Sequence, residues 1–313
     1  MSTFPDMLYH LGVVPCVNYN GNKFITGTAF FVDSNNGNAG YSGLKPGEAL
    51  TTLDAALGKC TTDKGDVIYL MPGHSETITG AGGITIDVPG VSIIGLGTGS
   101  LRPTFLMDAA ATVTALVTEE DCYLENVIFK AGHADIAVCM HISAKDFHIK
   151  NCRFIENAAN ENWVDIIHAG TADNDYDGLI IEGCEFIMDD AACVTAIDLL
   201  KDSAGVKILN NRIIGDFDAD PYAPIYSAST EIHKNILVMG NLIHNAHNDN
   251  SAVGISIANT ASTGWIVYNH VGAQDAANET PILAGAAGLY CGANYAAGVL
   301  GTASGYLYPG VDS

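Results

Sequence analysis

A six-residue phrase that begins and ends with an apolar residue recurs through the second half of this chain. Its copies are Leu124–Phe129, Ile149–Phe154, Ile181–Phe186, Ile208–Ile213, Val238–Ile243 and Ile266–Val271. Their fourth positions are residues 127, 152, 184, 211, 241 and 269, so neighbouring copies are separated by about 28 residues. Because one repeat of this size cannot bury its apolar face alone, the period predicts a solenoid.

The composition favours one elongated domain. The chain has 313 residues, of which 48% are hydrophobic and 15% are charged, and this is enough apolar mass for a long core. We expect an N-terminal arm or cap in residues 1–28, a stack of parallel β coils in 29–272 and a Gly/Ala-rich tail in 273–313. The arm is expected to cover the open sheet edge of the first coil.

Local patterns predict strands and one helix before the repeats begin. Residues 29–33 and 65–71 are apolar runs followed by turn residues, which is typical of strands. Apolar residues at helical spacing predict one amphipathic helix within 48–60. From Ile84 onward, β-branched residues and Gly/Asn turns indicate strands with hardly any helix.

The charge balance excludes two classes of partner. The 13 Lys and Arg residues and 35 Asp and Glu residues give a net charge of −22. Such a chain repels nucleic acid phosphates and anionic membrane surfaces, so neither is an expected partner. No stretch approaches the roughly 18 consecutive apolar residues that a membrane-spanning helix needs. The start Met1–Asp6 has no basic and apolar leader, so no N-terminal secretion signal is predicted.

The eight cysteines form no Cys-x-x-Cys pair, which argues against a zinc site. Cys152 and Cys184 occupy the same position of two repeats, between apolar neighbours. We expect both to be small buried side chains stacked in the core, and a disulfide between them is the alternative. Unpaired thiols of this kind suit a chain that folds in a reducing cytoplasm.

The asparagines at the fourth position of the later repeats predict an internal ladder. Asn211, Asn241 and Asn269 each lie one repeat apart. An Asn at a coil turn tolerates left-handed backbone and can hydrogen-bond to the same residue in the coils above and below. We therefore interpret this series as structural.

Several motifs resemble a known superfamily. The run Phe30–Gly37, the turn Gly43–Pro46, the segment Leu53–Ala56 and the run Gly65–Gly73 resemble the start of the pectin-lyase-like, right-handed parallel β-helices. The repeated phrases resemble their coils, and the resemblance covers about residues 29–272. It implies an all-β, right-handed parallel β-helix with one short N-terminal helix and terminal caps. It implies little about function, because the superfamily includes lyases, hydrolases, adhesins and phage proteins.

Three segments are similar to β-helix structural proteins of tailed bacteriophages, namely Gly65–Glu76, Ser100–Thr104 and Gly305–Pro309. This resemblance implies a virion component that is made in the host cytoplasm. It also implies a homotrimer whose partners are other virion proteins, such as the major capsid protein. It supplies no catalytic residues.

Acidic and polar residues follow the repeat phrases, and we expect them to stack along one edge of the solenoid, about 4.8 Å apart from coil to coil. They are Glu156, Asn157, Asp189, Asp190, Asp216, Asp218, Asp220, His244 and His247. Stacked carboxylates repel one another unless a cation, water or a raised pKa relieves them. The column is therefore a solvated rim, a calcium site, or a glycan groove in which Asp189, Asp190, Asp216 and Asp218 supply an acid and a base.

The segment Asp173–Gly178 matches the first half of a calcium loop. Asp173, Asp175 and Asp177 alternate before a Gly, which provides oxygen ligands and a sharp turn. The twelfth position is Cys184, where a calcium loop needs a bidentate Glu. The segment is thus either a calcium site or a plain polar turn, and no other cofactor is expected.

Enzyme signatures of this superfamily are incomplete in the chain. Polygalacturonase-like hydrolases combine an N-x-D strand with D-D, G-H-G and R-x-K. The pair Asp189–Asp190 is present here, but no G-H-G or R-x-K accompanies it. Pectate-lyase-like members need a basic residue beside calcium-binding carboxylates, and no strong set surrounds Arg153 or Arg212. We therefore expect a non-enzymatic virion protein, namely an exterior capsid decoration or cement protein. The alternative is a polysaccharide-cleaving or glycan-binding, tail spike-like protein.

Overall fold

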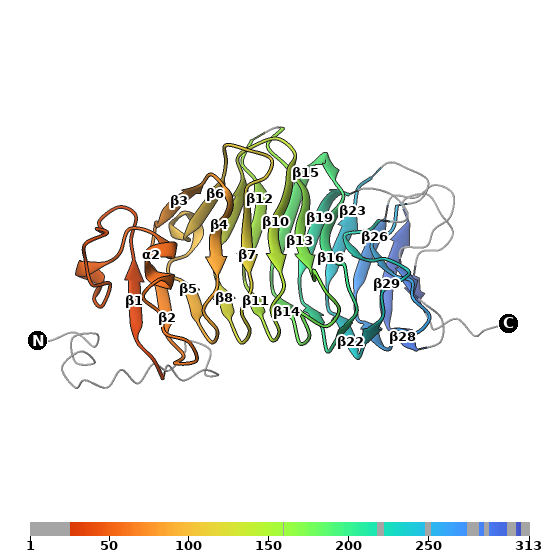
Figure 1. Ribbon diagram of the computed structural model, residues 1–313. Coiled ribbons are helices and arrows are strands. Elements are labelled where there is room, and N and C mark those ends of the chain that lie inside the picture. The colour runs from red at the N-terminus through yellow and green to blue at the C-terminus, as the bar shows by residue number, and fades with distance from the viewer. Residues whose placement is uncertain are drawn as a thin grey trace, which may run out of the picture.

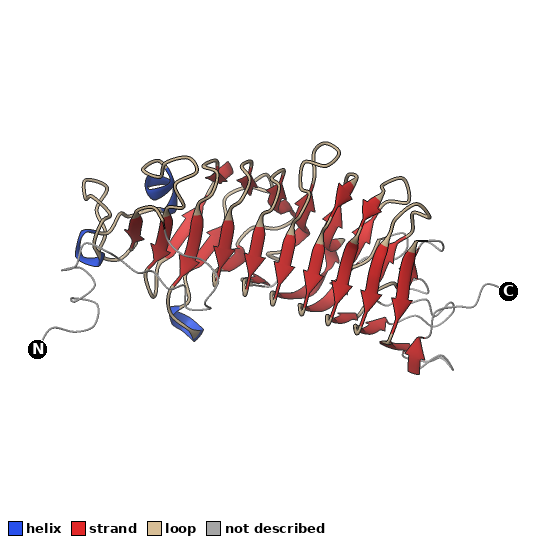
Figure 2. Cartoon of the chain, turned by 90° about the horizontal axis from the view of Figure 1, so that it is seen from below, coloured by secondary structure: helices blue, strands red, loops and turns tan. Residues whose placement is uncertain are grey.

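The computed structural model describes residues 26–158, 160–217, 222–247, 252–273, 282–284, 288–298 and 305–307, and they form a parallel β-helix (Figure 1). After the first coil, the chain passes repeatedly through three sheets, which we call sheets 1, 2 and 3. Figure 2, seen from below, shows the strands side by side along the length of the molecule. The expected fold class is confirmed.

Sheet 1 consists of β1 (Ala29–Val32), β2 (Val67–Leu70), β5 (Ser92–Gly95), β8 (Tyr123–Glu125), β11 (His148–Lys150), β14 (Ile180–Glu182), β18 (Lys207–Leu209), β22 (Ile236–Met239), β25 (Gly264–Val267) and β28 (Leu289–Gly292). Sheet 2 consists of β3 (Ser75–Ile78), β6 (Thr104–Met107), β9 (Ile128–Ala131), β12 (Arg153–Glu156), β15 (Glu185–Cys193), β19 (Arg212–Phe217), β23 (Leu242–Asn245), β26 (His270–Ala273), β29 (Asn294–Gly298) and β30 (Gly305–Leu307). Sheet 3 consists of β4 (Ala81–Ile86), β7 (Thr114–Val117), β10 (Ile136–Ile142), β13 (Trp163–Ala169), β16 (Thr195–Leu199), β20 (Ile225–Ser227), β24 (Ile255–Ile257) and β27 (Ile282–Ala284). A small fourth sheet pairs β17 (Ser203–Ala204) with β21 (His233–Lys234).

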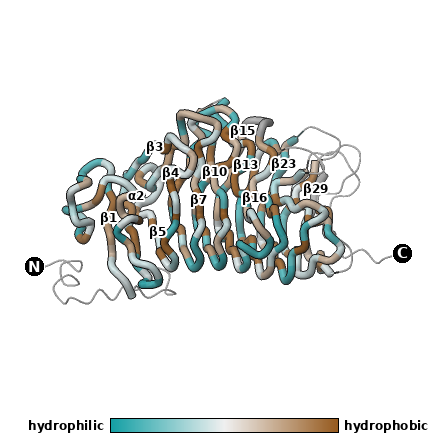
Figure 3. The backbone as a smooth tube through the Cα atoms, viewed as in Figure 1, coloured by the Kyte–Doolittle hydropathy of each residue, from teal (hydrophilic) through white to brown (hydrophobic). Residues whose placement is uncertain are grey.

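Inward-pointing side chains form one continuous core. Phe105, Phe129, Phe154 and Phe186 stack in a column, with 5.6, 5.3 and 4.8 Å between successive ring centroids. All four are almost fully buried. Burial of each ring stabilises the fold by roughly 1.5–3 kcal/mol relative to exposure. Figure 3 shows the apolar residues recurring along the strands from coil to coil.

The repeat phrase does not form a single strand, because it bends around the corner between sheets 1 and 2. In the copy Leu124–Phe129, β8 ends at Glu125 and β9 begins at Ile128. Asn126 lies between them with a φ of 61°, in the left-handed region. Later corners repeat this conformation at Asn151, Gly183, Asn210, Gly240, Tyr268 and Ala293. Asn and Gly adopt it at the least cost, which explains their frequency at the third position of the phrase.

The predicted asparagine ladder is confirmed, and Asn294 extends it. Asn211, Asn241, Asn269 and Asn294 are buried, and the Nδ2 of each of the first three donates to the Oδ1 of the next at 2.9–3.0 Å. Each Nδ2 also donates to a carbonyl oxygen of the preceding coil. The left-handed backbone, however, belongs to the residue before each ladder asparagine. The ladder therefore satisfies buried polar groups at the corner, and the preceding residue makes the turn.

Cys152 and Cys184 continue this ladder as free thiols. The N–H of Cys184 donates to Oδ1 of Asn211 at 2.8 Å, and the N–H of Cys152 donates to Sγ of Cys184 at 3.4 Å. Both side chains are buried. The seven cysteines in the described part of the chain are all free, so the alternative of a disulfide between Cys152 and Cys184 does not hold.

A short helix covers the N-terminal end of the core. Helix α2 (Leu53–Leu57) is shorter than the expected 48–60 and follows a 3-10 turn, η1 (Pro46–Glu48). Leu50 pairs with Val32 and keeps the backbone extended, so the helix begins only after Thr52. The Thr52 side chain accepts the N–H of Ala55 at 3.3 Å, which caps the helix. The expected cap in 1–28 lies almost wholly outside the described residues.

Parallel pairing continues beyond the expected boundary at residue 272. Strands β27, β28 and β29 each pair with the coil before them, and β30 adds an antiparallel strand to β29. The Gly/Ala-rich segment thus contributes strands to the solenoid. Among the described residues, no helix is both long and apolar enough to cross a membrane.

His233 is a fully buried imidazole at the corner between sheets 3 and 1, and it should make stability depend on pH. Its Nδ1 lies 2.8 Å from Oγ of Ser203 and its Nε2 lies 2.6 Å from Oγ of Ser227. Burial lowers the pKa of His233 from 6.5 to about 4. The unfolded chain therefore takes up this proton at a higher pH than the folded chain does. The stabilising contribution is complete above pH 6.5 and is lost as the pH falls toward 4.

We expect the free energy of unfolding to fall by about 2 kcal/mol between pH 7 and pH 5 through His233 alone. Urea unfolding at both pH values measures this. The His233→Gln variant is expected to lose stability at pH 7 but to show a flatter pH dependence. An equally steep dependence in this variant would assign the effect to other groups.

Candidate functional site

One row of side chains on sheet 3 combines titratable groups. Strands β7, β10, β13 and β16 lie side by side (Figure 1), and β20 pairs with β16. They place Leu116, His141, His168, Asp198 and Tyr226 in lateral register. Adjacent coils are about 4.8 Å apart, so residues in register are neighbours. Two imidazoles, a carboxyl group and a phenol thus occur on consecutive coils.

His168 lies between two carboxyl groups. Its Nε2 is 3.1 Å from Oδ2 of Asp165 and 3.9 Å from Oδ2 of Asp198. Thr195 donates from Oγ1 to Oδ1 of Asp165 at 2.7 Å, which orients that carboxylate. His141 packs edge-on against His168, with 5.1 Å between ring centroids. We call these five residues the sheet 3 cluster.

The environment of the cluster changes the acidity of two members. Burial raises the pKa of Asp198 to about 7, a change that the charge of His168 opposes and that of Asp165 reinforces. At neutral pH this carboxyl group is therefore a mixture of acid and carboxylate, and it can donate a proton. Burial and the neighbouring His168 lower the pKa of His141, so its imidazole is neutral at neutral pH.

The side chains of the cluster are largely buried but remain partly accessible to solvent. The side chains of Asp198, Asp165 and His168 are 10%, 16% and 17% exposed. Nε2 of His168 and Oδ1 of Asp198 are buried and have no hydrogen bond. The contact of His168 with Asp165 is short but is not aligned as a hydrogen bond. Buried polar atoms without a hydrogen bond are rare, and a catalytic role is one established reason for them. The geometry therefore suits proton transfer to a ligand.

The sequence prediction missed this cluster because it followed only the phrase at the corner of sheets 1 and 2. A second phrase recurs in sheet 3, with a polar residue between two smaller or apolar ones: Met140–Ile142, Ile167–Ala169, Ile197–Leu199 and Ile225–Ser227. Its middle positions are His141, His168, Asp198 and Tyr226. A polar position that recurs in otherwise apolar strands is the signal that could have found the site.

Three of the four residues predicted to form a glycan groove lie in sheet 2 strands. Asp189 and Asp190 belong to β15 and Asp216 to β19, whereas Asp218 lies outside the described residues. The N–H of Asp189 donates to Oε2 of Glu156 at 3.0 Å. Oδ1 of Asp216 is 2.8 Å from Nδ1 of His247. At this edge the carboxylate of Glu156 is thus paired with an N–H and that of Asp216 with an imidazole. The acid–base cluster lies instead on sheet 3.

The predicted calcium ligands are not brought together as one set. Oδ2 of Asp175 accepts the N–H groups of Thr171 and Ala172, so this carboxylate fixes its own turn. Oδ1 of Asp177 accepts the N–H of Ala204 in the next coil. Asp173 lies instead beside Asp202 and Glu231 of the next two coils, with one oxygen from each within 4.8 Å of the others. Stacking of coils thus places Asp173 beside residues of other repeats, and calcium at 173–177 stays a prediction.

Calcium is proposed to relieve the repulsion among Asp173, Asp202 and Glu231. Adding calcium at about ten times its dissociation constant is expected to stabilise the fold by about 1.4 kcal/mol. The Glu231→Gln variant should lose most of this gain, and the Glu120→Gln variant, a change of an exposed carboxylate elsewhere, should keep it. Thermal unfolding with calcium and with a chelator measures the difference. Equal gains in all three proteins would exclude this cluster as the calcium site.

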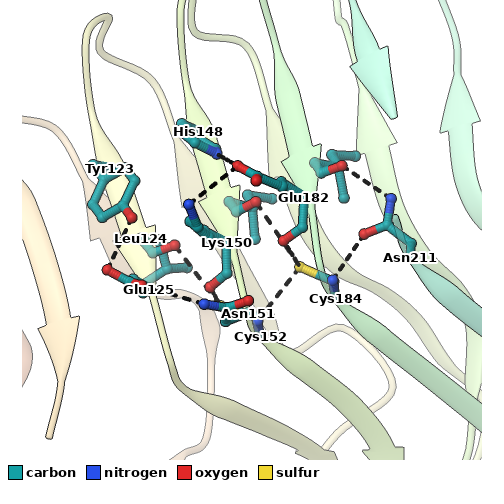
Figure 4. A network of polar contacts seen from close by, with 12 residues as sticks. Tyr123, Leu124, Glu125, His148, Lys150, Asn151, Cys152, Glu182, Cys184 and Asn211 are labelled. Atoms are coloured by element: carbon teal, nitrogen blue, oxygen red, sulfur yellow. Dashed lines mark hydrogen bonds and ion pairs between the residues drawn. The ribbon is translucent and has the colours of Figure 1, made fainter. Parts of the chain in front are cut away.

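The outer face of sheet 1 carries a further polar network (Figure 4). Tyr123 donates from its hydroxyl to Oε2 of Glu125 at 2.9 Å. Nε2 of His148 and Nζ of Lys150 lie 3.1 and 3.4 Å from Oε2 of Glu182. Each charge has a partner in its own or the next coil, so we interpret this network as structural.

Comparison with known proteins finds likeness in solved structures alone, since neither a protein-family model nor a curated protein matches the sequence. The pectin methylesterase of Aspergillus niger matches with a TM-score of 0.51 and 14% identity, over 91% of this chain and 90% of that one. A rhamnogalacturonan lyase matches with a TM-score of 0.46 and 16% identity, over 80% of this chain and 75% of that one. Pectate lyase Pel9A matches with a TM-score of 0.40 and 14% identity, over 90% and 79%.

The prediction that the chain is not an enzyme is wrong. It depended on missing signatures of two enzyme groups, but the structure that matches at a TM-score of 0.51 is an enzyme, and the sheet 3 cluster supplies acid–base groups from other positions. The comparisons give no support to the predicted phage relationship. At 14% identity the likeness establishes the fold, and the chain is an all-β protein with the right-handed parallel β-helix fold.

Proposed function

We propose that this chain cleaves a polysaccharide, with the sheet 3 cluster as its active site. The observation that carries the proposal is the convergence of two carboxyl groups, Asp165 and Asp198, on the single imidazole of His168. Because burial raises the pKa of Asp198 to about 7, this carboxyl group can both give and accept a proton at neutral pH. The pectin methylesterase, named for a polysaccharide substrate, has the same fold and supports this class of substrate.

The reaction we assign to the cluster is hydrolysis of a glycosidic bond. Asp198, in its protonated form, donates its proton to the glycosidic oxygen as the bond from that oxygen to the anomeric carbon breaks. Water adds to the anomeric carbon on the face that Asp198 occupies and loses a proton to the Asp198 carboxylate, which restores the acid, while His168 and Asp165 orient that carboxyl group. Thr195 holds Asp165 in place through its hydroxyl. The products are a reducing sugar end and the released alcohol.

The surroundings favour a neutral polysaccharide. Tyr226 is in register with Asp198, and its ring lies 5.1 Å from that of Tyr222, which is 39% exposed. An exposed aromatic ring near an acid suits the apolar face of a sugar ring. The net charge of −22 repels a polyanion over long distances. We therefore expect neutral glycans to be better substrates than acidic ones.

The test is a panel of neutral and acidic polysaccharides with detection of new reducing ends. Wild-type protein is compared with the Asp198→Asn variant and with the Asp189→Asn and Asp216→Asn variants. Cleavage that Asp198→Asn abolishes and the other two retain would support sheet 3 as the active site. Loss only in Asp189→Asn or Asp216→Asn would move the site to the edge of sheet 2. No cleavage of any member would argue against the proposal.

A location in a bacteriophage virion, as a tail spike-like protein or on the capsid exterior, is a second proposal. Its support is the similarity of Gly65–Glu76, Ser100–Thr104 and Gly305–Pro309 to phage proteins. It includes a homotrimer in contact with other virion proteins, such as the major capsid protein. Light scattering tests the trimer, whose mass would be three times the 32.8 kDa of one chain. A stable monomer would argue against a trimer that forms without other virion proteins.

A further inference from the structure

A pocket of about 380 Å³ opens at the corner between sheets 1 and 2. Its walls include Arg102, Arg153, Asn126, Asn151 and Glu185. No residue of the sheet 3 cluster lines it, so it is separate from the proposed active site. Two of the few basic residues of this chain therefore share one cavity.

The pocket exists because one corner is longer than those that follow. The corner between β5 and β6 spans residues 96–103 and contains the 3-10 turn η2 (Gly99–Leu101), whereas the next corner has only residues 126 and 127. Asn126 ties the long loop down, since its Nδ2 donates to the carbonyl oxygens of Gly95 and Gly97 at 2.6 and 3.1 Å. Arg102 is carried by this fixed loop beside the short corners of the following coils.

Arg102 is a half-buried cation that has no charge partner of its own among the residues that the structure describes. Its Nε is buried and has no hydrogen bond, and its side chain forms no ion pair within the described part of the chain. Arg153, by contrast, has its Nε 2.6 Å from Oε2 of Glu185, although this contact is not aligned as a hydrogen bond. Burial lowers the pKa of Arg102, and the charge of Arg153 lowers it further. A guanidinium nevertheless stays charged in proteins, so its desolvation is uncompensated.

We propose that this pocket binds a small ligand that carries an oxyanion on a hydroxylated body. Two guanidinium groups face one carboxylate here, which leaves a local positive charge in a chain of net charge −22. Planar guanidinium forks recognise carboxylate, sulfate and phosphate oxygens. The amide oxygens of Asn126 and Asn151 accept no hydrogen bond from the described residues and are free to accept ligand hydroxyl groups. The volume is in the range of small-molecule sites.

The experiment uses four hexoses that differ only at carbon 6: glucose, glucuronate, glucose 6-sulfate and glucose 6-phosphate. Titration calorimetry of the full chain is expected to show saturable binding of at least one charged sugar and none of glucose. The member that binds most tightly identifies the oxyanion. Equal or absent binding of all four sugars would overturn the proposal.

Variants place the binding in the pocket. Arg102→Gln is expected to weaken binding about tenfold or more, which corresponds to roughly 1.4 kcal/mol. Arg102→Lys keeps the positive charge but not the planar guanidinium group, so its affinity for the ligand should fall between those of wild type and Arg102→Gln. Arg212→Gln removes an arginine from the exposed start of β19, outside the pocket, and should change affinity by less than about twofold. Equal losses in Arg102→Gln and Arg212→Gln would show nonspecific attraction and would overturn the proposal. Circular dichroism confirms that each variant is folded.

Discussion

Replacement of Asp198 by Asn is expected to lower the turnover number on the polysaccharide by about 10²- to 10⁴-fold, the range typical for loss of a general acid. Asn has nearly the same shape but no proton to donate to the glycosidic oxygen. Asp198 is buried, with an exposed fraction of 7%. Because the two side chains have nearly the same shape, the substitution leaves the surrounding packing almost unchanged. The turnover number should therefore fall far more than the affinity for substrate.

The pH dependence of the wild-type protein gives a second readout of the same group. Because burial raises the pKa of Asp198 to about 7, the protonated form that acts as the acid is present below this pH. Activity should therefore decline as the pH rises through 7, by about tenfold per pH unit once the carboxylate dominates. In Asp198→Asn any residual activity should lack this decline.

Stability separates a catalytic from a structural role for Asp198. A carboxyl group whose folded pKa is raised contributes stability below its unfolded pKa and loses it as the pH rises through the folded pKa. Above pH 7 the buried carboxylate destabilises the fold, so Asp198→Asn should unfold at a higher temperature than wild type at pH 8. Asp54→Asn, a change of an exposed carboxylate on α2, should alter neither the turnover number nor the unfolding temperature. A less stable Asp198→Asn protein would mark this carboxylate as structural.

Replacement of Asn241 by Leu is expected to lower the free energy of unfolding by at least about 3 kcal/mol. Asn241 is fully buried in the middle of the ladder, where its Oδ1 accepts from both the N–H and Nδ2 of Asn211. Its Nδ2 donates to the carbonyl oxygen of Ile208 and to Oδ1 of Asn269. Leu fills the space but leaves these four groups without the partner that Asn241 provides. Urea unfolding followed by circular dichroism measures the loss.

The matched control for this prediction is Asn210→Gly, one residue before the ladder residue Asn211 of the preceding coil. Asn210 is exposed and has a φ of 54°, a conformation that Gly adopts freely, as Gly183 and Gly240 do at the same place. This substitution should change the free energy of unfolding by no more than about 0.5 kcal/mol. Comparable losses in the two variants would mean that the backbone turn, and not the buried amide ladder, carries the stability of the corner.

The sequence was most informative where a single position repeats with one chemical requirement. Phe129, Phe154 and Phe186 recur because the stacked coils need one large apolar side chain at that level of the core. Asn211, Asn241 and Asn269 recur because a buried corner leaves polar groups that only an amide can satisfy in both directions. Such constraints are local to one coil, so the period makes them visible without any structure.

The sites depended on relations between coils, which the order of residues does not display. His168 and Asp198 are 30 residues apart in sequence, yet parallel pairing of β13 with β16 puts them in register. Asp173 was grouped with Asp175 and Asp177 by spacing, but the structure places it beside Asp202 and Glu231. In the same way, Arg102 and Arg153 share a pocket because one corner is longer than those that follow.

The sequence alone thus determined the parallel β-helix and its amide ladder, because both follow from what one coil must bury. Only the tertiary structure decided which polar side chains meet. The register of neighbouring strands and the length of each corner set those meetings, and both arise from the packing of coils that are a whole repeat apart in the chain.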